Sequence, residues 1–196
     1  MRLRNTRICE PDDVYDVIIL GSGAGGLSAA VVAAAGGVSV CVLEKADVFG
    51  GTTALSGGVL WIPGNDVNAR QGVADNVDDA REYLKAMAGN FYDVERVDAF
   101  LNSGPEMVSW FENETEVAFE PQPEFPDYHP ELPGAVAGGR SIVAAPFDAR
   151  KLGADMTRLR PPLREITFVG MMFNASAEVK HFFAARRSLR SALYVF

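Results

Sequence analysis

Apolar residues near the N-terminus form two β-branched runs that flank an alanine-rich run, with glycines at the junctions. Residues 14–20 and 38–43 are short, apolar and rich in valine and isoleucine, which is typical of strands buried on both faces of a parallel sheet. Residues 27–35 carry small side chains and predict a helix that packs close to these strands. The order strand–helix–strand therefore predicts an α/β fold with parallel strands.

The pattern changes after this unit. Residues 46–72 are rich in glycine and lack a sustained period, which predicts a long loop that is either functional or disordered. Residues 75–89 have the spacing of an amphipathic helix, with Asp75 or Asn76 as the residue that caps its N-terminus. The apolar stripe expected on this helix consists of Val77, Ala80, Leu84 and Met87.

Two further helices are expected before the chain becomes irregular. One covers residues 93–102, and Pro105 starts the next, because proline is favoured in the first turn of a helix. Prolines recur in residues 121–134 and predict an extended, irregular segment. Residues 174–193 predict a last helix.

Composition and charge narrow the function classes. The chain has 196 residues, of which 48% are hydrophobic, so a globular core is expected and collagen-like or wholly disordered structures are excluded. The net charge of −8 argues against nucleic-acid binding, which needs a basic surface. Arg186, Arg187 and Arg190 are expected to form a solvated helix face. Two cysteines and two histidines are too few for a disulfide framework or a zinc site, so no metal site is predicted.

One uncharged stretch is long enough to cross a bilayer. Residues 17–43 contain no charged side chain, but two clusters of glycines interrupt them, and glycine weakens a helix interior. Asp12, Asp13 and Asp16 precede the stretch, which does not fit a secretory signal. We therefore expect no membrane span and a cytoplasmic protein.

Residues 21–26 match the spacing G-x-G-x-x-G between the first expected strand and its helix. In this pattern Gly21 permits a tight turn, Gly23 lets the backbone approach a pyrophosphate, and Gly26 allows close helix–strand packing. Glu44 follows the second strand, where an acid accepts hydrogen bonds from ribose hydroxyls and disfavours the 2′-phosphate of NADP. The predicted cofactor-binding residues here are Gly21, Gly23, Ala24, Gly25, Gly26, Glu44 and Lys45. The pattern leaves NAD, FAD and a ligand-free glycine turn open.

Residues 44–65, EKADVFGGTTALSGGVLWIPGN, resemble the flavin-binding segment of the fumarate reductase/succinate dehydrogenase flavoprotein superfamily. Within it, the likeness is closest to the 3-ketosteroid dehydrogenases. The resemblance implies FAD as the cofactor and a Rossmann-like FAD-binding βαβ unit. It also implies that Gly51, Thr52 and Thr53 lie along the ribityl–diphosphate, and that Ser56, Gly57 and Gly58 pass the isoalloxazine.

The resemblance continues through residues 126–131 and 138–141. In the 3-ketosteroid dehydrogenases an aromatic pair spaced by three residues faces the steroid, and Phe125 and Tyr128 have that spacing here. The resemblance implies that Phe125 binds substrate as a hydrophobic wall and that Tyr128 is catalytic, assisting a second tyrosine that acts as the base. An aromatic pair that only anchors a proline-rich loop is the alternative.

The resemblance also implies a domain organisation and an activity. Residues 14–115 would be the N-terminal part of the FAD-binding domain, and residues 116–196 the beginning of a truncated, mixed α+β substrate and catalytic domain. Because members of this family are several times longer, the fold is expected to be incomplete and to need a complementing C-terminal portion. The implied activity is hydride transfer from a C–C bond of a ring ketone, such as a steroid, to the flavin. The alternatives are a catalytically silent flavin-binding fragment and a portion of a fumarate reductase-like enzyme.

Overall fold

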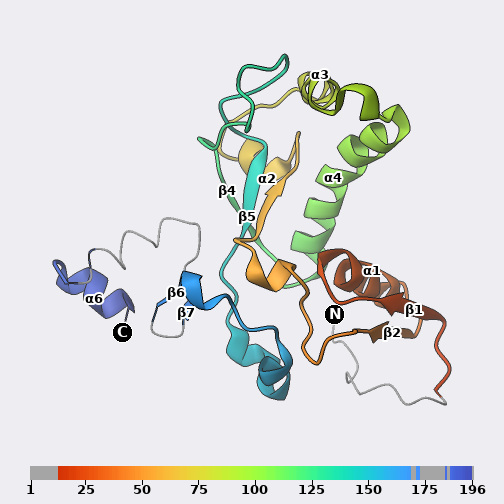
Figure 1. Cartoon of the computed structure of the whole chain (residues 1–196), viewed down its shortest axis with the longest axis vertical. Coiled ribbons are helices and arrows are strands. Elements are labelled where there is room, and N and C mark those ends of the chain that lie inside the picture. The colour runs from red at the N-terminus through yellow and green to blue at the C-terminus, as the bar shows by residue number, and fades with distance from the viewer. Residues whose placement is uncertain (1–12, 169–170, 173–183, 185, 196) are drawn as a thin grey trace. The chain divides into compact units, whose positions relative to one another are not determined.

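The structure is a computed structural model that describes residues 13–168, 171–172, 184 and 186–195 (Figure 1). The chain consists of two compact units, one formed by Met1–Gly58 with Asp148–Phe196 and the other by Val59–Phe147. These units are defined by which residues pack together. The functional division expected between residues 115 and 116 concerns cofactor and substrate binding and stays a prediction.

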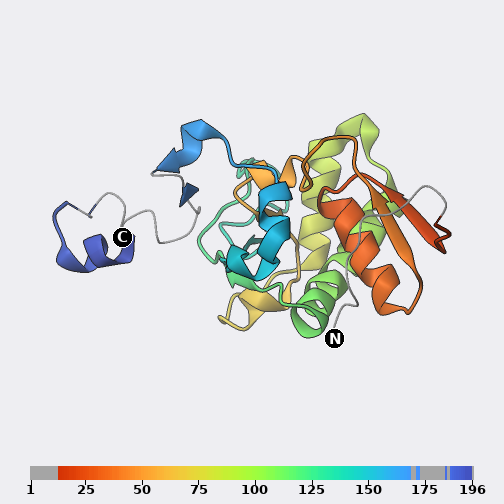
Figure 2. The same cartoon turned by 90° about the horizontal axis from the view of Figure 1, so that it is seen from below.

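The first unit contains the expected strand–helix–strand motif. Strand β1 (Val17–Leu20) leads into helix α1 (Ala24–Ala35), which is followed by strand β2 (Val40–Leu43). The two strands pair in parallel along their whole length, from Val17 opposite Val40 to Leu20 opposite Leu43. In both views α1 runs alongside this pair (Figures 1 and 2). The α/β fold with parallel strands is therefore confirmed.

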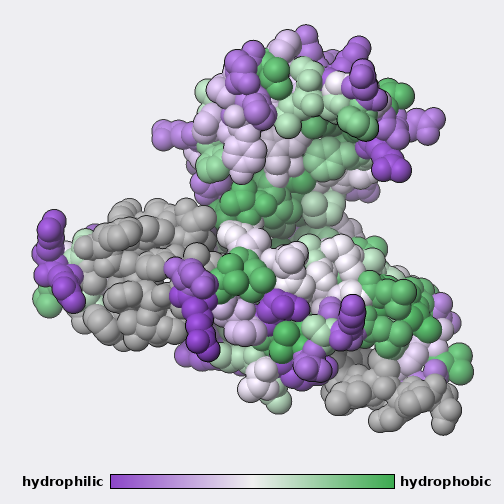
Figure 3. All heavy atoms as spheres, in the orientation of Figure 1, coloured by the Kyte–Doolittle hydropathy of each residue, from purple (hydrophilic) through white to green (hydrophobic). Residues whose placement is uncertain are grey.

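The expectation that these strands are buried on both faces is wrong for the described residues. Residues of β1 alternate between half-buried and exposed, with Ile18 60% and Leu20 79% exposed, and Leu43 of β2 is also exposed. The sheet has two strands in the described part of the chain, so α1 covers one face and the other stays open. Hydrophobic residues accordingly gather on the surface where β1, β2 and α1 lie (Figure 3).

The remainder of the first unit consists of short elements. The 3₁₀-helix η1 (Thr53–Leu55) follows β2, and η3 (Ala149–Arg158) and η4 (Arg164–Ile166) lie in the C-terminal part. Strands β6 (Thr167–Phe168) and β7 (Met171–Met172) pair antiparallel, and helix α6 (Leu189–Val195) comes last. Most of the helix expected over residues 174–193 lies outside the described residues. Arg186, Arg187 and Arg190 are exposed, as expected, but Arg186 and Arg187 lie in a turn, and only Arg190 belongs to α6.

The chain folds back on itself within this unit at Phe49. Its backbone N–H donates to the carbonyl of Arg158 over 2.9 Å, and its carbonyl accepts from the N–H of Arg160 over 2.8 Å. Phe49 and Leu159 form a parallel bridge between these segments. Backbone hydrogen bonds to Arg158 and Arg160 therefore hold the start of the glycine-rich segment that begins at Gly50.

The second unit is built on an antiparallel sheet in the order β3–β5–β4. Its strands are β3 (Val59–Trp61), β4 (Phe119–Pro121) and β5 (Ser141–Ala144). Helices α2 (Asp66–Ala69), α3 (Val77–Ala88), the 3₁₀-helix η2 (Gly89–Phe91) and α4 (Val94–Glu114) accompany it. Its buried core contains Ile62, Val67, Val108 and Ile142. The segment of residues 46–72 thus includes η1, β3 and α2, so it is more regular than its sequence pattern predicts.

Two sequence expectations about helices are settled in this unit. Asn76 caps α3, since its side-chain oxygen accepts a hydrogen bond from the N–H of Asp78 over 2.9 Å. The expected break at Pro105 is wrong, because α4 continues through that residue as a helix of 21 residues. Leu101 and Val108, on either side of the proline, are buried on one face of α4, and this packing offsets the hydrogen bond that proline cannot donate.

Candidate functional site

The glycine-rich turn between β1 and α1 has the close backbone packing expected from its sequence. Gly21 has a φ of 95°, a left-handed conformation that glycine adopts without strain. A Cβ atom on Gly26 would lie 2.0 Å from the carbonyl oxygen of Gly21 and 3.5 Å from Cγ2 of Ile19 in β1. Position 26 therefore tolerates no side chain if the turn keeps its shape, whereas an added Cβ at Gly25 would meet nothing within 4 Å.

Glu44 lies against this turn. Its Oε2 accepts hydrogen bonds from the N–H of Ser22 over 2.9 Å and from the Ser22 hydroxyl, and its Oε1 accepts from the N–H of Ala46 over 2.9 Å. The Ala46 amide first, and then the hydroxyl and amide of Ser22, lower the pKa of Glu44 to about 2. The carboxylate is therefore ionised at neutral pH, and the exposed side chain of Lys45 follows it.

The segment of Gly51, Thr52 and Thr53 is brought to the N-terminus of α1. The Thr53 hydroxyl accepts a hydrogen bond from the N–H of Ala24, the first residue of α1, over 3.0 Å. An added Cβ on Gly51 would lie 3.0 Å from Cα of Gly23, so the two backbones touch here. Thr52 is exposed and precedes η1.

A cavity of about 210 Å³ lies at this contact. Its lining residues are Ser22, Gly23, Ala24, Leu27, Phe49, Gly50, Thr53, Ala54 and Leu159. Gly23 precedes α1 without a side-chain cap of its own, and the first N–H of the helix, that of Ala24, donates to Thr53. The later N–H groups of the first turn point toward the same end of the helix. Small residues, helix N–H groups and a nearby hydroxyl together fit a dinucleotide diphosphate.

The segment of Ser56, Gly57 and Gly58 follows η1. The hydrogen bonds of the Ser56 side chain are to neighbouring residues of the chain. The Ser56 hydroxyl donates to the carbonyl of Thr53 over 2.8 Å and accepts from the N–H of Gly58 over 3.2 Å. Ser56 and Gly57 are exposed, so their surfaces are available to a ligand.

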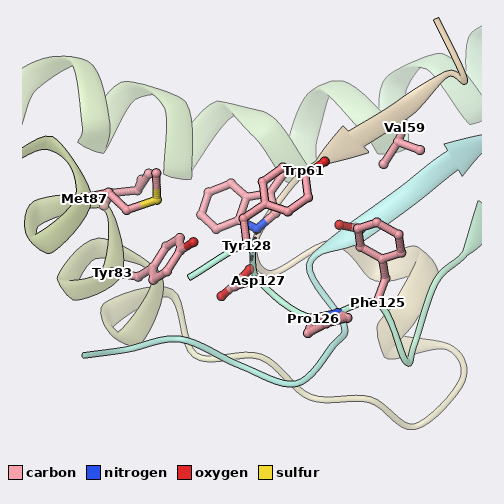
Figure 4. Close-up of a pocket in the computed structure, with 10 residues that line it drawn as sticks. Val59, Trp61, Tyr83, Met87, Phe125, Pro126, Asp127 and Tyr128 are labelled. Carbon is pink, nitrogen blue, oxygen red and sulfur yellow. Dashed lines mark hydrogen bonds between the residues drawn. The ribbon is translucent and has the colours of Figure 1, made fainter. Parts of the chain in front are cut away.

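The second unit contains a larger, apolar cavity of about 350 Å³ (Figure 4). Its lining residues are Val59, Trp61, Tyr83, Leu84, Met87, Phe125, Pro126, Asp127, Tyr128 and Ser141. Phe125 and Tyr128 both belong to it, and their rings meet edge to face at a centroid distance of 6.4 Å. Tyr128 is 83% exposed, so its phenol is accessible to a small molecule. The structure thus brings the aromatic pair to one pocket.

A buried charged cluster behind this pocket was not anticipated from the sequence. Arg140 is 1% exposed, and its Nη1 donates to Oδ2 of Asp127 over 2.7 Å while its Nε donates to Oδ1 of Asp75 over 3.1 Å. Its guanidinium carbon lies 5.7 Å from the ring centroid of Trp61 and 6.0 Å from that of Tyr83. Asp75 is therefore an ion-pair partner and not a helix cap.

The signals for this cluster in the sequence were weak. Arg140 follows two glycines, and Asp127 lies inside the proline-rich segment, so each is a charged residue in an apparent loop. Their pairing depends on strand β5 and the 125–128 segment coming together, which spacing along the chain does not show.

The described residues hold no group of three metal-ligating side chains that could bind a metal ion. Within the same residues, no helix combines the length and the apolar character that crossing a bilayer requires.

Comparison with known proteins agrees with this geometry. Residues 16–192 match the family described as FAD binding domain. A 3-oxosteroid 1-dehydrogenase of Mycobacterium tuberculosis is 50% identical over 147 residues, which are 75% of this chain and 26% of that protein. A 4-oxocyclohex-2-ene-1-carboxylate 5-dehydrogenase of Sinomonas cyclohexanicum is 41% identical over 180 residues, which are 92% of this chain and 30% of that protein.

Among solved structures, the chain is similar to the 3-ketosteroid Δ1-dehydrogenase of Sterolibacterium denitrificans in complex with 1,4-androstadiene-3,17-dione. The TM-score is 0.79 at 37% identity, over 91% of this chain and 31% of that one. The chain thus spans a quarter to a third of the length of these relatives. FAD is the cofactor that the family match and the glycine-rich cradle both indicate. This chain belongs to the FAD binding domain family.

Proposed function

We propose that this chain is part of an FAD-dependent oxidoreductase that converts a C–C bond of a ring ketone to a double bond, as a 3-ketosteroid dehydrogenase does, with a hydride leaving one carbon for the flavin and a proton leaving the adjacent carbon for a base. The observation that carries the proposal is the apolar pocket of the second unit, which holds an exposed phenol beside an aromatic wall. A cyclic ketone with a hydrocarbon skeleton fits such a lining, because burying its apolar surface is favourable. The relatives named above act on cyclic ketones, a 3-oxosteroid in one case and 4-oxocyclohex-2-ene-1-carboxylate in the other.

In this proposal the first unit holds the cofactor. The N-terminus of α1 and the Thr53 hydroxyl would bind the diphosphate, and the ionised Glu44 would accept hydrogen bonds from ribose hydroxyls. Lys45, Gly51 and Thr52 would border the same part of the cofactor. The predicted isoalloxazine contacts are Ser56, Gly57 and Gly58. The flavin, when bound, supplies the hydride acceptor, while the protein supplies binding and orientation.

The second unit would hold the substrate. Phe125 would form one wall for the hydrocarbon rings, and the Tyr128 hydroxyl would hydrogen-bond the group that accepts the proton. Tyr128 is therefore proposed as a residue that assists a second tyrosine, which acts as the base.

A fumarate reductase-like activity receives less support from the same pocket. Binding a dicarboxylate needs positively charged side chains directed at both carboxylates. None of the ten lining residues is a lysine or arginine, and Arg140 behind the pocket is already bound to two aspartates.

We also propose that a further polypeptide portion completes the enzyme. The open apolar face of β1 and β2 and the short coverage of the relatives support it. The division into an FAD-binding part over residues 14–115 and a substrate part over residues 116–196 belongs to the same proposal. We place this chemistry in the cytoplasm.

Two measurements test the proposed function. The purified chain is titrated with FAD, and binding is followed by flavin fluorescence, with Gly26→Ala as a variant that should lose it. Reduction of a dye is then measured with 4-androstene-3,17-dione as the hydride donor. The assay is run with the chain alone and with the proposed further portion added. No FAD uptake under either condition would overturn the cofactor assignment, and FAD uptake without ketone-dependent reduction would overturn the activity.

A further inference from the structure

The carboxylate of Asp127 holds the short segment that carries the aromatic pair. Asp127 lies between Phe125 and Tyr128 in sequence, and its side chain points away from solvent. Its Oδ1 accepts a hydrogen bond from Nε1 of Trp61 over 2.7 Å (Figure 4). Its Oδ2 accepts from Nη1 of Arg140, also over 2.7 Å. Phe125 and Tyr128 are therefore within two residues of a buried carboxylate that is held by two hydrogen bonds.

The backbone around this anchor is tied as well. The N–H of Asp127 donates to the carbonyl of Val136 over 3.1 Å, and the N–H of Val136 donates back to Oδ2 of Asp127 over 3.0 Å. The N–H of His129 donates to the hydroxyl of Tyr83 over 3.2 Å. The proline-rich segment is thus an irregular loop whose shape depends on a few side-chain contacts instead of a strand ladder.

Arg140 connects these contacts to one another. Its fork of N–H donors reaches Asp127 and Asp75 at once, and its guanidinium lies beside the rings of Trp61 and Tyr83. Three members of this cluster, Trp61, Tyr83 and Asp127, also line the pocket. Arg140 itself does not line the pocket, so it would act on a ligand only through the residues that it holds.

We propose that Arg140 is a positioning residue that fixes Phe125 and Tyr128 in the wall of the apolar pocket through Asp127 and Trp61. The pocket's role in ketone binding rests on the proposed function, whereas the effect of Arg140 on the 125–136 segment does not. Lysine cannot replace arginine here, because a single ammonium group lacks the planar fork that bonds two carboxylates together.

The first test is hydrogen exchange of the full chain measured by mass spectrometry. In Arg140→Lys, amides of residues 125–136 should exchange about tenfold faster, while those of α4 keep their protection. Arg70→Lys is the matched control, since Arg70 belongs to the same unit and pairs with Glu112 at an exposed position over 2.8 Å. Unchanged exchange in residues 125–136, or an equal loss of protection in α4, would overturn the positioning role.

The second test is spectroscopic. It substitutes Asp127 and not Arg140, so it stays informative if an Arg140 variant does not fold. Trp61 and Trp110 are the only tryptophans, so Trp110→Phe leaves Trp61 as the single reporter. In that background Asp127→Asn removes the charge but retains an oxygen that can accept from Trp61. We expect its Trp61 emission to shift and exchange in residues 125–136 to rise. If both stay as in the parent, Asp127 and Arg140 do not position this segment.

The third test measures ligand binding. Titration of the single-tryptophan protein with 1,4-androstadiene-3,17-dione should quench Trp61 emission, and Asp127→Asn should weaken this binding about tenfold. Equal affinity in both proteins would overturn the positioning role. A parent protein that does not bind the steroid would instead count against the proposed substrate class, and the exchange experiment alone would then decide the role of Arg140.

Discussion

At the scale of single residues, the two neighbouring glycines Gly25 and Gly26 have opposite surroundings. A methyl group at position 26 would collide with the carbonyl of Gly21, so Gly26→Ala must displace the turn. We expect a loss of about 1–3 kcal/mol in the free energy of unfolding, as for other overpacked sites, together with loss of FAD binding. Thermal and urea unfolding measure the first effect and flavin fluorescence the second.

Gly25→Ala is the control for this prediction. The added methyl group meets no atom within 4 Å, and alanine favours the helix more than glycine does. We expect unchanged or slightly higher stability in Gly25→Ala. Equal unfolding curves for the two variants would show that the turn is not as tightly packed as the structure describes.

The carboxylate of Glu44 gives a pH dependence with a definite sign. Its pKa falls from 4.5 to about 2 in the folded chain, so the folded state prefers the ionised form. This contribution to stability is present above pH 4.5 and is lost as the pH falls toward 2. The difference in unfolding free energy between the parent and Glu44→Gln should therefore be constant between about pH 5 and 7 and shrink below that range.

Urea unfolding at a series of pH values measures this difference. Asp47→Asn provides a control, because Asp47 is an exposed acid three residues farther along the same segment. A difference between the parent and Glu44→Gln that does not change down to pH 2 would contradict the described hydrogen bonds of Glu44.

At the scale of elements, buried amides replace hydrophobic periodicity in the segment around α2. Asn68 is fully buried, and its Nδ2 donates to the carbonyl of Ser141 in β5 over 2.9 Å. Its Oδ1 accepts from the N–H of Gln122 after β4 over 3.1 Å. One side chain thus connects a short helix with two strands that are distant in sequence.

We expect Asn68→Ala to lower the free energy of unfolding by about 2–4 kcal/mol, because the buried carbonyl of Ser141 and the part-buried N–H of Gln122 lose their partners. Asn102→Ala, at an exposed position of α4, should change it by less than about 0.5 kcal/mol. Urea unfolding followed by circular dichroism measures both. Similar small effects in the two variants would mean that water or another group bonds to the Ser141 carbonyl and the Gln122 N–H after the substitution.

These contacts explain how far the fold could be predicted from the sequence. The βαβ motif was predictable because its signals are local: a β-branched run, glycines at fixed spacing and an acid after the second strand. Residues 46–72 were expected to be a loop because Asn68 and its partners leave no periodic pattern. The break expected at Pro105 was wrong for a related reason, since the buried face of α4 depends on packing against residues such as Ile62.

The candidate site divides in the same way. The glycine turn and Glu44 lie in contact in the structure, as the local sequence pattern predicts. Their contacts with the cofactor stay predictions. The Arg140 cluster joins Asp75, Asp127 and Trp61 across the second unit, and no local pattern links residues so far apart. Long-range side-chain pairing of this kind becomes visible only with the tertiary structure.

At the scale of the whole molecule, the open face of the β1–β2 pair relates the chain to its longer relatives. Ile18 and Leu20 expose apolar side chains there, whereas Ile19 points to the opposite face, where Cγ2 lies 3.5 Å from an added Cβ on Gly26. Exposed apolar surface of this kind binds hydrophobic dyes and attracts other polypeptides. The relatives are three to four times longer than the segment they share with this chain, so they contain ample sequence to cover it.

The double variant Ile18→Thr/Leu20→Thr tests this view. Because both side chains are exposed, the free energy of unfolding should change by less than about 1 kcal/mol, while binding of the dye ANS falls. Ile19→Thr should instead destabilise the chain, since its side chain packs between sheet and helix. When the proposed further portion is co-expressed, the parent chain should retain FAD through purification and the double variant should not. Equal FAD retention by the two proteins would show that this face does not receive the added polypeptide.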